Sequence, residues 1–288
     1  EGAQGLDFSQ LSARRMLNID SEDEGIFTVS CAGGARANLD VTLSCAPCSL
    51  PTAVLELTGL TGGHSGEEIN KGRANAAILL GRLLAALSDV APFRLVSAES
   101  GLKDNAIPAA ARAVIAAEAD QMEALRACAD RMAAAFRAEY AVSDPGLTLT
   151  VRPGNPAPSA LTDEAGTAGV RFLQLVPNGI QAMSMDIPGL VQTSCNLGIF
   201  HVTDGVLTAV SSVRSSVATQ KQMLLTRFDA LTQMLGGSLQ ITGAYPAWEY
   251  RRESALREKL VEVYRAQTGK GTPAHAKAAG KAKDAPFT

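Results

Sequence analysis

The amino-acid sequence predicts an α+β fold, in which two split β-α-β-like units form a mostly antiparallel sheet with helices on one face. Two observations support this prediction. The order helix, strand, strand, helix, strand occurs twice, within about residues 50–153 and again within residues 160–243, and one extra strand precedes the first copy. That order is typical of a split β-α-β unit. A proline-rich joint, "RPGNPAPSA", separates the two halves.

The first half begins with "AVLELTG", whose apolar residues alternate as in a half-buried strand. A helix is expected from about Glu67 to Leu87, because its apolar residues recur at helical spacing. The loop "GLKDNAIPAA" joins two strands, "FRLVSAES" and "ARAVIAAE". A second helix, about Ala119 to Tyr140, and the strand "LTLTVRP" complete this half.

The second half repeats the order with a helix over about Asp163 to Leu175. The strands "VQTSCNLGIFHV" and "VLTAVSSVRSS" are expected to pair across the hairpin signal "TDG". A helix over about Thr219 to Leu235 and the strand "GSLQITG" follow. Outside the two halves, "IFTVSCAGG" is interpreted as a short strand that ends in a glycine turn, and "SALREKLVEVYRAQTG" as an amphipathic helix that ends at glycine.

Composition argues against several classes of function. The chain has 288 residues, 46% of them apolar, and a net charge of −3, without the basic patch typical of nucleic-acid binding. No apolar run has the length of a membrane span. The five cysteines include one C-x-x-C pair, Cys45 and Cys48, without the second pair of a structural zinc site. We interpret them as reduced cysteines of a cytoplasmic protein.

The stretch "LTGLTGGHSGEEINKGRANA" places His64 between glycines, after a strand and before a helix. A phosphate-binding loop would need a terminal Gly-Lys-Ser/Thr, whereas acidic residues follow here. Ser65 and Glu68 have the spacing of a helix capping box. A capping box leaves His64 unexplained, because a loop tip presents a side chain rather than packing it.

Three further features each have two interpretations. "NIDSEDEG" carries clustered carboxylates, including Asp20, which suit either a divalent metal or a solvated loop. Asn105 lies in a strand-connecting loop, where asparagine also favours turns. Arg214, at the end of a predicted strand, is either a surface charge or a clamp for a carboxylate.

The joint order of these blocks resembles one family. "NIDSEDEG", "CAGG", the His64 stretch, "FRLVSAESGLKDNAIP", "VSDPGL", "DIPGLVQTSCNLG", "VRSS" and "GAYPAW" are similar to the aminoacyl-histidine dipeptidases, also called Xaa-His dipeptidases or peptidase D. These belong to the two-zinc aminoacylase and carboxypeptidase-like metallopeptidases. The resemblance covers residues 5 to 265, nearly the whole chain.

The resemblance implies an α/β catalytic domain that binds two zinc ions (Zn), with a two-layer lid domain inserted in it. Asp20 would be a zinc ligand, and His64 would polarise the scissile carbonyl and stabilise the oxyanion. Asn105 and Arg214 would hold the backbone and the C-terminal carboxylate of a dipeptide. A cytoplasmic homodimer is expected, in which His64 serves its own or the partner's site. The implied domains are 1–43 and 244–268 (remnants of the catalytic domain), 44–243 (lid) and 269–288 (an atypical tail, expected to be disordered).

The chain departs from the family pattern at both ends. The family's His-x-Asp motif, bridging aspartate and Glu-Glu pair would all precede Asp20, and they are absent from this sequence. His275 is the one candidate for the family's last zinc histidine, in a block whose other residues differ. We therefore expect the full-length protein to hydrolyse dipeptides and this chain alone to be inactive. The alternatives are a dimerisation or peptide-binding module that is not an enzyme, or a related deacylase or tripeptidase.

Overall fold

The computed structural model describes residues 26–270, the backbone of Ala274–Lys277 and short parts of the stretch 7–18. Its centre is a nine-stranded sheet in which every pairing is antiparallel. The order across this sheet is β14 (Ser238–Tyr245), β2 (Gly33–Thr42), β13 (Val206–Ser215), β12 (Val191–Thr203), β6 (Arg94–Ser100), β8 (Ala111–Ala116), β4 (Thr52–Thr58) and β9 (Thr148–Pro153), and β11 (Gly179–Met183) also pairs with β12.

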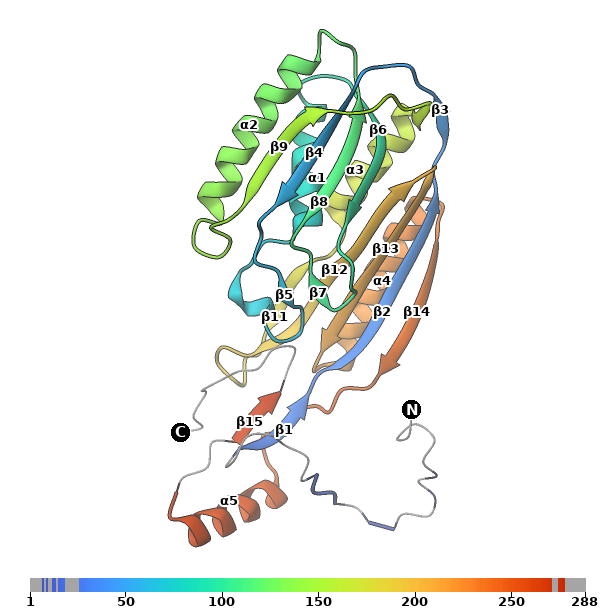
Figure 1. Cartoon of the computed structure of the whole chain (residues 1–288). Coiled ribbons are helices and arrows are strands. Elements are labelled where there is room, and N and C mark those ends of the chain that lie inside the picture. Colours follow the sequence, from blue (N-terminus) through green and yellow to red (C-terminus); the bar gives the residue numbers. More distant parts are fainter. Residues whose placement is uncertain are drawn as a thin grey trace.

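Four helices cover one face of the sheet (Figure 1). They are α1 (Ala76–Ser88), α2 (Met122–Glu139), α3 (Asp163–Leu175) and α4 (Ala218–Met234). One buried cluster contains alternate strand residues, such as Leu55 and Leu57 of β4, together with the leucines of α1. The predicted α+β class, with a mostly antiparallel sheet and helices on one face, is confirmed.

The sheet consists of two units with the same topology. In the first, β4-α1-β6-β8-α2-β9, the strands lie in the order β6-β8-β4-β9. The second has the order β12-β13-β2-β14 and takes β2 from the chain ahead of the first unit. The two units join where β12 pairs with β6, with His201 opposite Glu99. The predicted repeat is therefore present, with the first unit inserted between β2 and the rest of the second.

Strand β2 corrects one local prediction. The "CAGG" stretch was expected to be a turn, but Gly33 and Gly34 lie inside a ten-residue strand. A Cβ on Gly34 would lie 2.6 Å from the Tyr245 hydroxyl, and one on Gly33 would lie 2.5 Å from the Ala247 nitrogen. These glycines therefore allow close approach of Tyr245, at the end of β14, and of the segment after it, rather than a reversal of the chain. The domain boundary expected after residue 43 would separate β2 from the sheet in which it lies between β14 and β13.

The start of α1 is a second correction. The helix was expected from Glu67, but it begins at Ala76, where the Asn75 side chain accepts hydrogen bonds from the backbone N–H groups of Ala77 and Ile78. Ahead of it, a short 3-10 helix, η3 (Ile69–Lys71), ends at Gly72 with φ of +66°. A left-handed glycine ends a helix, so the apolar spacing that includes Ile69 does not continue as one helix.

Three two-stranded sheets and one helix lie outside the large sheet. β3 (Cys45–Pro47) pairs with β10 (Ser159–Leu161), and β5 (Gly63–His64) pairs with β7 (Ala106–Ile107). β1 (Phe27–Cys31) pairs in parallel with β15 (Ala274–Lys277), and the amphipathic helix α5 (Ala255–Thr268) ends at Gly269 as predicted. Within the described residues, no helix combines the length and apolar character that a membrane span requires.

Candidate functional site

The His64 loop lies at one end of the sheet, where β5, β7 and β11 gather (Figure 1). In the β5–β7 pair, His64 lies opposite Ala106. The backbone N–H of Ser65 donates a 2.9 Å hydrogen bond to the Asn105 carbonyl oxygen. The two loops that carry His64 and Asn105 are therefore joined directly, although they are far apart in the sequence.

Arg214 meets the same loop from β13, where it lies between Gly34 of β2 and Ser194 of β12. A Cβ on Gly66 would lie 2.9 Å from Arg214 Cζ and 3.0 Å from His64 Cε1. The arginine and histidine side chains thus both pack against Gly66. The structure brings together three residues that the sequence singled out, from three separate segments.

The hydrogen bonds of His64 determine which ring nitrogen is the donor. Its Nδ1 accepts from the backbone N–H groups of Gly66 and Glu67, at 3.1 and 3.2 Å. Because both partners are donors, the neutral ring carries its proton on Nε2. His64 therefore presents an Nε2–H donor.

Arg214 adds positive charge beside that donor. Its Nε is buried and has no hydrogen-bond partner within the described part of the chain. Buried polar groups in native proteins are almost always hydrogen-bonded. An unpaired guanidinium nitrogen next to an imidazole N–H favours a ligand that carries oxygen atoms and negative charge.

Glu68 stabilises the turn that presents His64. Its carboxylate accepts a 2.9 Å hydrogen bond from the His64 backbone N–H and contacts Lys71 Nζ at 2.7 Å and Arg73 at 3.1 Å. The hydrogen bond from Lys71, followed by the one from His64, lowers the pKa of Glu68 to about 2. The predicted capping box is wrong: Ser65 Oγ is buried without a partner among the described residues, and Asn75 caps the helix instead.

Replacing Glu68 by glutamine is expected to lower the free energy of unfolding by about 1 kcal/mol at neutral pH, given that solvent partly screens these pairs. Because folding lowers this pKa from 4.5 to about 2, the contribution is complete above pH 4.5 and is lost as pH falls through 2. Urea denaturation of both proteins at several pH values should show the difference narrowing below pH 4.5. A difference that stays constant down to pH 2.5 would contradict this assignment.

The loop that carries Asn105 is held on both sides of that residue. Ser212 Oγ donates to the Asp104 carbonyl oxygen at 2.8 Å, and Asn196 Nδ2 donates to the Ala106 carbonyl oxygen at 2.8 Å. A Cβ on Gly198 would lie 2.4 Å from the Asp104 carbonyl oxygen, so only glycine allows this approach. The exposed Asn105 side chain is thus presented from a fixed backbone.

Sequence reasoning missed the buried amide network behind this loop. Asn75 Nδ2 donates to the Leu197 carbonyl oxygen at 2.9 Å and to the side-chain oxygens of Asn178 and Asn196 at 3.2 Å. The only available signal was the presence of Asn75 and Asn196 inside "NKGRANA" and "TSCNLG". Asparagine occurs in turns so often that this signal was not specific.

The described residues do not fit a two-zinc centre. Asp20 lies outside them. For His275, in β15, only the backbone is described, and it pairs with Thr28 of β1. Within the part of the chain that the structure describes, no group of three or more His, Cys, Asp or Glu side chains is placed to hold a metal ion. The site described above offers hydrogen-bond donors and positive charge.

Comparison with known proteins gives a family match and two relatives. Residues 55–144 match the family described as "Peptidase dimerisation domain". The matched stretch runs from β4 to the loop after α2, within the first unit of the sheet.

Two relatives give the comparison in more detail. The Cytosol non-specific dipeptidase of Escherichia coli (strain K12) is 33% identical over 266 residues, which cover 92% of this chain and 55% of that protein. The crystal structure of Aminoacylhistidine Dipeptidase from Vibrio alginolyticus superposes with a TM-score of 0.89 at 27% identity, covering 95% of this chain and 56% of that one. This chain is homologous to these dipeptidases and spans about half the length of each.

Proposed function

We propose that this chain forms the substrate-binding lid of a zinc-dependent dipeptidase. In this proposal Arg214 binds the C-terminal carboxylate, Asn105 binds the peptide backbone, and His64 donates from Nε2 to the scissile carbonyl oxygen. The packing of His64 and Arg214 against the same glycine, Gly66, is the observation that supports it most directly. The homology to two dipeptidases supports the choice of a dipeptide as substrate.

The chemistry of His64 suits a carbonyl that becomes an oxyanion. A hydrogen bond to a neutral carbonyl oxygen strengthens when negative charge develops on that oxygen, so a preoriented donor stabilises the transition state more than the ground state. The two backbone N–H groups at Nδ1 and the Glu68 contact to the His64 N–H hold the donor in place before substrate arrives.

Hydrolysis also needs an activated water, and the described residues supply no metal centre for one. We propose that the two-zinc site forms mainly in regions that the relatives have and this chain does not span, with Asp20 as a contributor. This chain alone is then expected to bind dipeptides weakly and not to cleave them.

The domain organisation follows the same proposal. We propose that residues 44–243, joined by strand β2, form the lid and dimerisation unit, and that the segment 244–268 returns to the catalytic domain. A cytosolic homodimer is proposed, on the match to a dimerisation domain and on the relative named for the cytosol.

Isothermal titration of the chain with Ala-His, with added Zn²⁺ and product analysis of the same samples, tests this function. Gly66→Ala keeps every proposed binding side chain but displaces Arg214 and His64, because its Cβ would contact both. We expect affinity to fall about tenfold in this variant. Gly166→Ala, where a Cβ finds its nearest atom at 3.9 Å, is the control and should bind normally.

Two results would overturn the proposal. Equal affinity of the Gly66→Ala variant and the unchanged chain would mean that dipeptides do not bind between His64 and Arg214. Turnover of Ala-His by the unchanged chain with Zn²⁺ would mean that it forms a complete active site. Tighter binding of N-acetylhistidine than of Ala-His would favour the related deacylase function.

A further inference from the structure

Asp144, in the loop between α2 and β9, is an acidic residue with only 1% of its surface exposed. Burying a carboxylate is costly unless hydrogen-bond donors replace the water that it loses. Three donors do so here. They are the backbone N–H groups of Thr61 and Ala74, at 2.8 and 2.9 Å, and the Ser143 hydroxyl, at 2.8 Å.

These contacts hold both ends of the loop that carries His64. Asp144 Oδ1 accepts from Thr61, shortly after β4, and Oδ2 accepts from Ala74, shortly before α1. The Thr61 hydroxyl also donates to the Ser143 carbonyl oxygen at 2.7 Å. One side chain therefore joins the two ends of the segment from Thr61 to Ala74, and His64 lies between these two anchors.

The loop depends on anchors because of its glycines. Gly62, Gly63 and Gly72 lie inside it with φ of +61°, +136° and +66°. Glycine loses more conformational freedom on folding than any other residue, so a loop of this composition needs external contacts to keep one shape. Arg73 links the two ends from inside the loop by donating to the Gly62 carbonyl oxygen, whereas Asp144 connects both ends to a different part of the fold.

This arrangement requires two acceptors on one short side chain. An ionised carboxylate offers two oxygens and no donor, whereas an asparagine amide offers one oxygen and an NH₂ group. In Asp144→Asn, the backbone N–H of either Thr61 or Ala74 would face that NH₂ group and lose its acceptor. One end of the loop would then be released.

We propose that Asp144 is a positioning residue of the dipeptide site, which sets the place of His64 relative to Arg214 and Asn105. The inference rests on the proposed function, in which His64 donates from Nε2 to the scissile carbonyl oxygen. The Asn105 loop has supports of its own, in the hydrogen bonds to the carbonyl oxygens on both sides of that residue. Release of the Asp144 anchor therefore acts mainly on His64.

NMR of the histidine ring nitrogens at about pH 8.5, where histidine is ordinarily neutral, tests the positioning without any dipeptide. The unchanged chain should show a single tautomer of His64, with the proton on Nε2. In Asp144→Asn the shifts of the two ring nitrogens should move toward each other, because a loosened loop removes the N–H donors from Nδ1 part of the time. His64→Ala identifies the signals among those of the three histidines.

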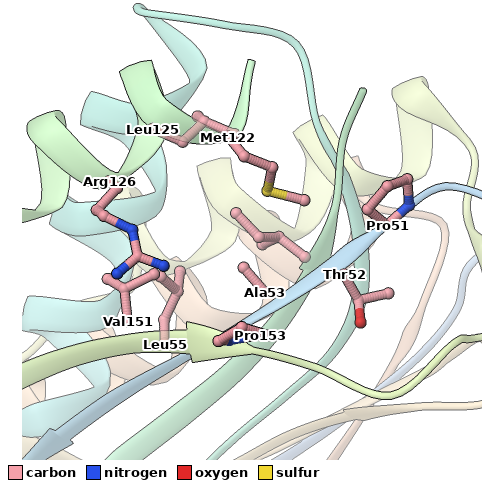
Figure 2. Close-up of a pocket in the computed structure, with 10 residues that line it drawn as sticks. Pro51, Thr52, Ala53, Leu55, Met122, Leu125, Arg126, Val151 and Pro153 are labelled. Carbon is pink, nitrogen blue, oxygen red and sulfur yellow. The ribbon is translucent and has the colours of Figure 1, made fainter. Parts of the chain in front are cut away.

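A matched control separates positioning from a general loss of stability. Figure 2 shows Leu125 of α2 at the wall of a cavity of about 210 Å³, which lies between α2 and the strands β4 and β9. Leu125→Ala enlarges this cavity near the start of α2, whereas Asp144 follows the end of that helix. Its melting temperature should fall while the His64 signals stay in place. Unmoved His64 signals in Asp144→Asn, or equal movement in Leu125→Ala, would overturn the proposal.

Calorimetric titration with Ala-His shows whether the anchor acts through His64. Asp144→Asn should weaken binding about fivefold, but less than about twofold when His64 is already alanine, because no donor is then left to position. The same fivefold loss in the His64→Ala background would contradict the proposal. If the unchanged chain does not bind Ala-His, the proposed function fails, while the ring signals still decide whether Asp144 positions His64.

Hydrogen exchange on the unchanged chain needs no variant that folds. Thr61 is an exposed residue whose backbone N–H is bonded to Asp144, so slow exchange of this amide is expected to come from that anchor. A Thr61 amide that exchanges as fast as an unstructured peptide would show that Asp144 does not hold this end of the loop.

Discussion

Replacing Arg214 by alanine is expected to weaken binding of Ala-His about 100-fold, the largest effect on ligand binding that we predict. The guanidinium lies beside His64, and its buried Nε has no hydrogen-bond partner among the described residues, so this side chain is available to pair with a carboxylate. Truncating one partner of a buried, hydrogen-bonded charge pair typically costs 2–5 kcal/mol. Calorimetric titration of the folded variant gives the measurement.

A ligand without the carboxylate separates this role from a structural one. C-terminally amidated Ala-His should bind the unchanged chain and the Arg214→Ala variant with similar affinity, because neither complex contains the ion pair. Arg214→Lys should recover only part of the loss, since an ammonium does not reproduce the two-pronged geometry of a guanidinium. If the variant loses the acid and the amide equally, Arg214 supports the loop rather than the carboxylate.

The order of the helices and strands was predictable because the spacing of apolar residues along the sequence distinguishes strands from helices. Alternation in "AVLELTG" and helical spacing in α1 both correspond to residues of one buried cluster. Strand β2 was misread because Gly33 and Gly34 look like a turn, and the reason for them, Tyr245, lies over 200 residues away. A local sequence pattern gives no information about a contact between residues so far apart in the chain.

The site was predictable only in part. His64, Asn105 and Arg214 were singled out from the sequence, and the structure places them together, but their roles remain a proposal. The predicted start of α1 was wrong because Glu68 has the spacing of a capping residue. In the structure its carboxylate instead binds Lys71, Arg73 and the His64 N–H. Which of several nearby donors a carboxylate such as that of Glu68 binds depends on the folded conformation of the loop.

Replacing Asn75 by aspartate is expected to lower the free energy of unfolding by about 3–5 kcal/mol, the largest effect on stability that we predict. Aspartate is as good a helix N-cap as asparagine, so capping alone predicts no loss. The Asn75 amide, however, donates to three oxygens, those of Leu197, Asn178 and Asn196. A carboxylate there would face these oxygens at hydrogen-bond distance in a buried position.

Urea denaturation distinguishes the two roles of this residue. Asn75→Ala removes both the cap and the amide donor and should cost about 2–4 kcal/mol, so aspartate should be at least as destabilising as alanine. Because Asn196 also donates to the Ala106 carbonyl oxygen, hydrogen exchange in the Asn105 loop should accelerate in both variants. An aspartate variant as stable as the unchanged chain would show that Asn75 acts only as a cap, and the loop would then owe its position to Ser212 and to the close approach at Gly198.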